Sequence, residues 1–216
     1  MTTVQTGHEF RDTHIGRLTQ LAAGGSIGEA ICGIAVVVLA IIGLSNHDWT
    51  ALASIGTIVA GAALIMAASA GMRAAATNGS TEVEGAMSAE VLGGAAGIVL
   101  GILAIVGIMP NLLNTVALIV FGGALILGCL TTSRAPASGP ELGRYMPTHA
   151  AMAAAGSQAL IGLAVGILGI VGLVGNPDHA VTIDLVGLLV VGAGVLITGS
   201  AVSARLVSVL RESTGP

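Results

Sequence analysis

Long uninterrupted apolar runs dominate the pattern along this chain. A membrane-spanning α-helix needs about 20 apolar residues at a rise of about 1.5 Å each. The runs are apolar on every side, as from Val36 to Leu44, whereas the strands of a membrane barrel alternate apolar and polar residues. The pattern therefore predicts an all-α integral membrane protein with six transmembrane helices, over residues 24–44, 51–72, 88–109, 112–132, 152–174 and 183–204.

The composition agrees with this prediction and narrows the partners. The 216 residues are 54% hydrophobic and only 8% charged, with a mean hydropathy of +0.97. The net charge of −4 offers no basic surface for nucleic acid. The lipid bilayer is therefore the expected partner, and nucleic acid is not.

The distribution of arginine predicts the orientation. All seven basic residues lie in the tails, in the two longer connections or directly after a span, and the three connections within helix pairs carry none. Because cytoplasmic segments are enriched in basic residues, both termini are expected in the cytoplasm. The first span begins some twenty residues into the sequence and lacks a basic n-region followed by a small-residue cleavage site, so we expect it to be retained.

The three helix pairs repeat one another. The first helices contain GIAVVVLAIIGL (33–44), GIVLGILAIVGI (97–108) and GLAVGILGIVGL (162–173). The second helices end in GAALIMAASAGMR (61–73), GGALILGCLTTSR (122–134) and AGVLITGSAVSAR (193–205). Since each unit crosses the membrane twice, the repeats are predicted to be parallel and related by a pseudo-threefold axis along the membrane normal. The predicted segments are a cytoplasmic N-terminal tail (1–23), hairpins over 24–76, 88–134 and 152–206, cytoplasmic loops over 77–87 and 135–151, and a cytoplasmic C-terminal tail (207–216).

This repeat pattern resembles a known family. Three tandem hairpins, a glycine-studded first helix, a short outer connection with Pro110 or Pro177, and a second helix ending in Arg are similar to the HdeD-like acid-resistance membrane proteins of bacteria. The resemblance covers about 24–205. It implies a location in the bacterial inner membrane and a role in acid stress, with no catalytic chemistry and no cofactor.

Small residues recur at every fourth position on the first helix of each repeat. Such stripes let another helix approach closely, whereas lipid offers no matching surface. We therefore expect the three first helices to pack centrally, or against a neighbouring subunit in a homo-oligomer or larger membrane complex. The helix-packing candidates are Gly33, Gly93, Gly97, Gly101, Gly162 and Gly166.

Glu29 is the main charged residue predicted inside the bilayer, where charge is costly. Alignment of the repeats on their last shared glycine places Glu29 opposite Gly93 and Gln158. Glu29 and Gln158 are therefore expected to meet across the gap left by Gly93. Three interpretations stay open: a proton-responsive polar site, a protonated glutamate acting as packing glue, and an interfacial glutamate that reaches the headgroups.

The other charged residues near span ends have simpler interpretations. Glu90 and Asp184 are expected near helix N-termini, where negative charge is favoured by the helix dipole. Three arginines at the ends of the second helices, Arg73, Arg134 and Arg205, are expected to anchor the inner leaflet as a ring.

Catalytic and metal-binding chemistry finds little support. The five His lie in tails or loops, and the pairs His47–Asp48 and Asp178–His179 are interpreted as solvated loop residues rather than as a zinc site. No nucleophile, metal or phosphate motif is present. The sequence predicts no enzymatic activity, no metal and no cofactor.

The leading prediction is a non-catalytic structural or accessory membrane protein, related to acid or other stress, that assembles through its glycine-rich helix faces. The alternative is a small channel or transporter for protons or a small solute, with Glu29 and Gln158 as its polar centre.

Overall fold

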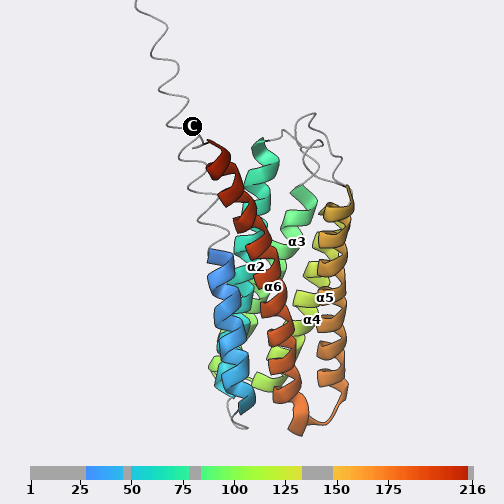
Figure 1. Ribbon diagram of the computed structural model, residues 1–216. Helices are drawn as coiled ribbons and strands as arrows, with labels where there is room; N and C mark the ends of the chain where they lie inside the picture. The colour runs from blue at the N-terminus through green and yellow to red at the C-terminus, as the bar shows by residue number, and fades with distance from the viewer. Residues whose placement is uncertain (1–27, 46–49, 78–83, 133–147, 214–216) are drawn as a thin grey trace, which may run out of the picture.

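The computed structural model describes residues 28–45, 50–77, 84–132 and 148–213, and these residues form helices joined by short turns (Figure 1). Five helices are long and apolar enough to cross a membrane, and the remaining one, α3, contains a shorter apolar stretch, Ala89–Ile105. The prediction of an all-helical chain with the character of a multi-pass membrane protein is confirmed for these residues. The helices are an N-terminal helix (Gly28–Ser45), α2 (Thr50–Thr77), α3 (Glu84–Ile105), α4 (Pro110–Thr132), α5 (Thr148–Val174) and α6 (Pro177–Ser213).

Tight turns join α3 to α4 and α5 to α6 at the lower end of Figure 1, which we call the short-connection end. Gly107 ends α3 with a φ of 93°, the left-handed conformation that commonly stops a helix. Asn176 caps the start of α6, because its Oδ1 accepts a hydrogen bond from the backbone N–H of Asp178 at 3.1 Å. Both α4 and α6 open with proline, which suits the first helical position. The opposite end of the bundle, where α2, α4 and α6 end, is called the long-loop end.

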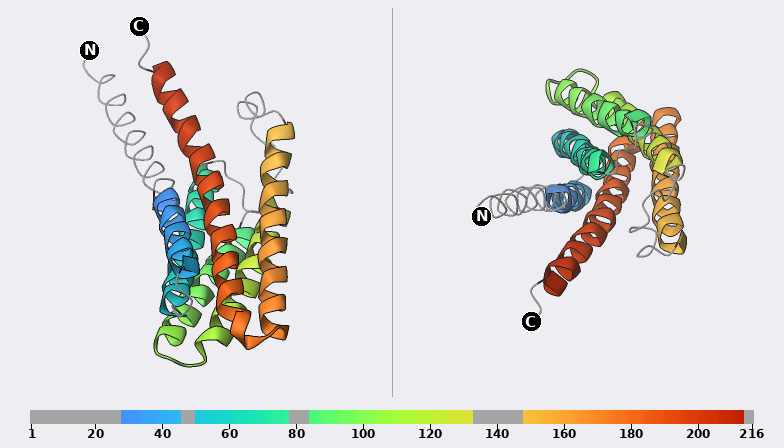
Figure 2. Two further views of the ribbon diagram at one scale, coloured as in Figure 1. Left: turned by 60° about the horizontal axis from the view of Figure 1, so that its bottom comes forward. Right: turned by 90° about the horizontal axis from the view of Figure 1, so that it is seen from above.

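The second helix of each pair forms the inside of the bundle. The buried share of the apolar window is 50% in α2, 56% in α4 and 50% in α6, against 28% in the N-terminal helix and 22% in α5. The expectation that the first helices pack centrally is therefore wrong. Figure 2 shows the helices splaying from one another above the bundle, where α6, with 37 residues, extends furthest among the described elements.

The physical reason is that the first helices have two different sides. One side carries large apolar residues such as Ile31, Leu92 and Leu160, which are 60%, 68% and 69% exposed and suit contact with lipid. The other side carries small residues, which let the outer helix lie directly against an inner one.

Glycine pairs make these contacts. A Cβ built on Gly33 would lie 3.2 Å from the carbonyl oxygen of Gly192 in α6, and one built on Gly162 would lie 2.9 Å from that of Gly122 in α4. Gly94 of α3 meets Gly61 of α2 in the same way. The close helix contacts expected of small residues thus form between helices of this one chain.

The six glycines predicted to pack helices together lie at such close contacts between helices. Five of them leave too little room for a side chain because a neighbouring helix is in contact, and they are Gly33, Gly93, Gly97, Gly101 and Gly162. Gly166 has space for a Cβ, but its backbone touches the position a side chain at Gly122 would take.

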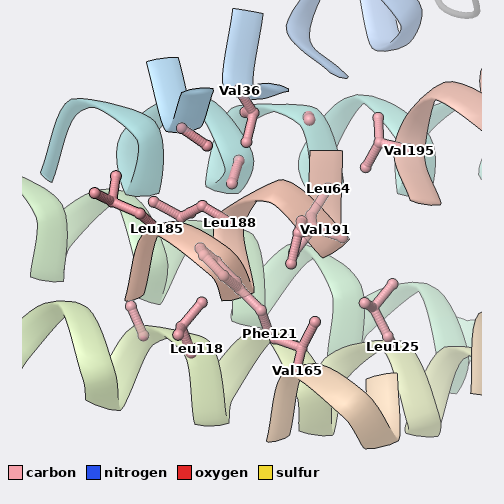
Figure 3. Close-up of a cluster of buried hydrophobic side chains, with 14 of the residues drawn as sticks. Val36, Leu64, Leu118, Phe121, Leu125, Val165, Leu185, Leu188, Val191 and Val195 are labelled. Atoms are coloured by element: carbon pink, nitrogen blue, oxygen red, sulfur yellow. The ribbon is translucent and has the colours of Figure 1, made fainter. Parts of the chain in front are cut away.

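A hydrophobic core fills the space between the inner helices (Figure 3). Phe121, Leu118 and Leu188 are each at most 1% exposed, and the N-terminal helix and α5 add Val36 and Val165. This apolar layer lies between two groups of polar side chains, one towards each end of the bundle.

Candidate functional site: a small cavity with three polar residues

Three outer helices bring a polar side chain to one small cavity in the long-loop half of the bundle. The cavity has a volume of about 30 Å³, enough for about two water molecules. Its polar lining residues are Glu29, Glu90 and Gln158, and we call these three the axial triad. The inner helices contribute apolar walls, including Leu64, Leu125 and Val195.

The triad is tightly held. Glu29 is only 5% exposed, and Gln158 Nε2 donates a hydrogen bond of 2.7 Å to Glu90 Oε1. Glu90 also lies against Gly128 of α4, where an added Cβ would collide with Oε1 of the glutamate. A glycine at this place in α4 is therefore what gives the Glu90 side chain its room.

Glu29 and Gln158, which were expected to meet, both line this cavity, and Glu90 is a third polar residue there that the repeat alignment did not predict. Glu90 had been expected near the start of a span as a helix cap. In the structure α3 begins at Glu84, so Glu90 lies beyond the first turn and accepts a hydrogen bond from α5 instead. Gly93, expected to leave the gap, lies against Ala124 of α4.

The three triad residues occupy matching places on their helices. Residues 28–44, 89–105 and 157–173 follow nearly the same order of buried, half-buried and exposed positions. In this order Glu29, Glu90 and Gln158 coincide, as do Gly33, Gly94 and Gly162. The repeats had been aligned on their last shared glycine, which is Gly107 in the second repeat. Gly107 lies in the turn after α3, so this alignment displaced α3 by three residues.

A second polar group lies towards the short-connection end, between the inner helices. Asn114 Nδ2 of α4 donates to Ser54 Oγ of α2 at 3.1 Å. Thr115 Oγ1 of α4 and Asp184 Oδ1 of α6 are hydrogen-bonded to each other at 2.9 Å. Asp184 had been expected to cap a helix, but α6 begins at Pro177, so Asp184 is 1% exposed within the bundle. When α4 and α6 are aligned by their pattern of buried and exposed residues, Asp184 occupies the position of Asn114.

Other predicted residues lie outside these groups. Asp178 and His179 are exposed at the start of α6. The side chains of Arg73 and Arg205, and the whole of Arg134, fall outside the described residues, so the arginine ring stays a prediction.

The described side chains offer proton and hydrogen-bond chemistry more than any other. Cys32 and Cys129 are both free, and in the described part of the chain no group of three His, Cys, Asp or Glu is placed to hold a metal ion. Carboxyl groups that share a small cavity with an amide can hold and exchange a proton without any other reactive group.

No family model, curated protein or solved structure matches this chain.

Proposed function

We propose that this is a non-catalytic, acid-responsive membrane protein whose helix packing depends on a proton held by the axial triad. The observation that carries the proposal is that matching positions of three outer helices bring two carboxyl groups and one amide to a single small cavity.

The charge of the cavity depends on its proton content. One N–H of the Gln158 amide donates to Glu90 Oε1. Two ionised glutamates would place two like charges in one small apolar-walled space, which is costly in a low-dielectric interior. One added proton removes a negative charge and gives the cavity an O–H donor. A protonated cavity therefore favours the closed packing of the outer helices.

Several finer features belong to the same proposal. The three hairpins are parallel repeats around a pseudo-threefold axis through the cavity, and the long-loop end faces the cytoplasm of a bacterial inner membrane. An acid-stress role of the HdeD-like kind fits a fold that responds to protons. Assembly with copies or with other membrane proteins would use lipid-facing sides of the helices, since the glycine contacts are occupied within the chain.

A proton or solute pathway is the second candidate, because polar groups lie on both sides of the core. The core itself argues against a continuous path. Phe121, Leu118 and Leu188 are fully packed between the two polar groups, and no described helix is interrupted near its middle.

The experiment compares Glu29→Gln, Glu90→Gln and the double variant with the wild-type chain by thermal unfolding in lipid nanodiscs. On this proposal the bound proton stabilises the folded wild type, so its stability should fall as pH rises. The double variant should show a clearly weaker pH dependence, and Asp178→Asn, at an exposed site, should leave the dependence as in the wild type. An unchanged pH dependence in the double variant would contradict the proposal.

Proton flux into liposomes separates the two candidates. The proposal expects flux no higher than in empty liposomes. Robust flux in the wild type that disappears in Glu29→Gln would establish the pathway instead.

A further inference from the structure

Asp184 has a buried carboxyl group, and one of its two oxygens has no hydrogen-bond partner. Its side chain is 1% exposed, Oδ1 lies 2.9 Å from Thr115 Oγ1, and the buried Oδ2 has no hydrogen-bond partner. None of the side chains that the structure describes is Lys or Arg, so none of the described residues supplies such a cation to balance a charge here. An ionised Asp184 would leave a full anionic oxygen without a donor inside an apolar bundle, which is costly.

Thr115 has two acceptors within reach and a single hydrogen to give. Its Oγ1 lies 2.7 Å from the backbone carbonyl oxygen of Asn111 and 2.9 Å from Asp184 Oδ1. A hydroxyl group donates one hydrogen bond and can accept others. A single O–H can point fully at only one of these acceptors. Both contacts are full two-centre hydrogen bonds when Asp184 carries a proton on Oδ1 and donates it to Thr115.

We propose that Asp184 is a second proton-binding site, separate from the axial triad and loaded from the short-connection end. The proton binds to Asp184 Oδ1 and is donated to Thr115 Oγ1. The Thr115 hydroxyl then donates to the carbonyl oxygen of Asn111, and no other bond is made or broken. Loss of the proton to water turns the Thr115 hydroxyl back towards Asp184 and leaves that carbonyl without its extra donor.

A pocket supplies the route for this proton. It has a volume of about 200 Å³ and lies between α4, α5 and the start of α6, where it is lined by Asn111, Thr115, Gly172 and Pro177 among others. Asn111 and Thr115 are polar residues in the lining of this pocket, and Thr115 is the residue in contact with Asp184. Pro177 is exposed, and the pocket therefore lies at the surface of the bundle.

The titratable groups nearby are few. On α6, Asp178 and His179 come earlier in the helix and are exposed. The elements packed near Asp184 present Thr115 from α4, Gly172 from α5 and Gly43, which contacts Leu185, from the N-terminal helix. The other titratable side chains described on these elements are Glu29, Cys32 and Cys129. Glu29 and Cys129 lie 14 residues along their helices from Gly43 and Thr115, or about 21 Å.

Infrared spectroscopy of the full chain in nanodiscs tests the assignment, because a protonated carboxylic acid has a carbonyl band distinct from that of a carboxylate. In the Glu29→Gln/Glu90→Gln background, this band should be present at neutral pH. It should disappear on further substitution with Asp184→Asn and persist with Asp178→Asn. A spectrum unchanged by Asp184→Asn would overturn the proposal.

A pair of variants at position 115 provides a test that does not depend on whether the Asp184→Asn variant folds. Thr115→Val removes the acceptor of the Asp184 proton, so the acid band should shift to higher frequency or vanish. Thr115→Ser retains the hydroxyl and should leave the band in place. Identical spectra for both variants would show that Asp184 does not donate to Thr115. The triad substitutions do not touch this site, so the proposed function can fail while this assignment stands.

Discussion

The aromatic ring of Phe121 occupies the space that a side chain at Gly97 would fill. A Cβ built on Gly97 would collide with Cε1 and Cζ of that ring. At the matching places the other helices carry Val36 with Ala60, and Val165 with Val191. In the second hairpin the core is thus filled by a large residue on the inner helix, and the outer helix contributes no side chain at this position.

This relationship predicts a compensating pair of substitutions. Gly97→Val should be destabilising by about 1–3 kcal/mol or more, because a packed interior cannot move the ring aside without strain. Gly97→Val combined with Phe121→Ala recreates the Val36–Ala60 arrangement and should recover most of that loss. Chemical unfolding of the three proteins in mixed micelles measures both effects. A double variant that is less stable than Gly97→Val alone would contradict this account.

The contact of Glu90 with α4 predicts that two glycine-to-alanine substitutions in this helix have different effects on stability. Gly128→Ala should push Glu90 away from Gln158 and cost about 1–3 kcal/mol, since the new Cβ collides with Oε1. Gly123→Ala has no atom within 4 Å of its Cβ and should stabilise by about 0.5–1 kcal/mol, the usual gain for alanine in a helix interior. Thermal unfolding of the pair provides the comparison. Equal effects would mean that Glu90 is not held against Gly128.

The helices were predictable because their signal is local. Continuous apolar runs of membrane-spanning length, with Pro110 and Pro177 at helix starts, determine where each helix lies regardless of its neighbours. Which helices are central was not predictable in this way. The glycine stripe was correctly recognised as a close contact, but its partner could be another outer helix or an inner one, and only the packing of the whole chain decides between them.

The site was half predictable. Burial of Glu29 followed from its place in an apolar run, and Gln158 from the repeat. Glu90 was missed because the alignment was fixed on Gly107, a turn residue, although Glu29 and Glu90 share the 61-residue spacing of Gly61 and Gly122. Asp184 was misplaced because α6 starts earlier, at Pro177.

Polar contacts between the inner helices should show measurable coupling. In a double-mutant cycle, Ser54→Ala and Asn114→Ala should couple by about 0.6 kcal/mol, with an upper range of about 1.7 kcal/mol, as for other hydrogen bonds between membrane helices. The physical basis is the 3.1 Å bond from Asn114 Nδ2 to Ser54 Oγ. The matched control pairs Asn114→Ala with Ser45→Ala, since Ser45 bonds the carbonyl of Ile42 in its own helix. Unfolding free energies of all variants give both couplings, and equal values would rule out a specific bond.

Adjacent positions on α6 test which residue matches Gly122. The sequence alignment paired Gly122 with Ala193, whereas in the structure Gly192 meets Gly33 as Gly122 meets Gly162. Gly192→Leu should therefore separate α6 from the N-terminal helix, because a Cβ there already lies 3.1 Å from the Gly33 carbonyl oxygen and 2.9 Å from Val37. The cost should be at least about 1–3 kcal/mol. Ala193 is exposed, so Ala193→Leu should change stability by no more than about 0.5 kcal/mol. Thermal unfolding in nanodiscs separates the two variants, and the reverse order of stability would show that α6 is turned by one residue from the arrangement described.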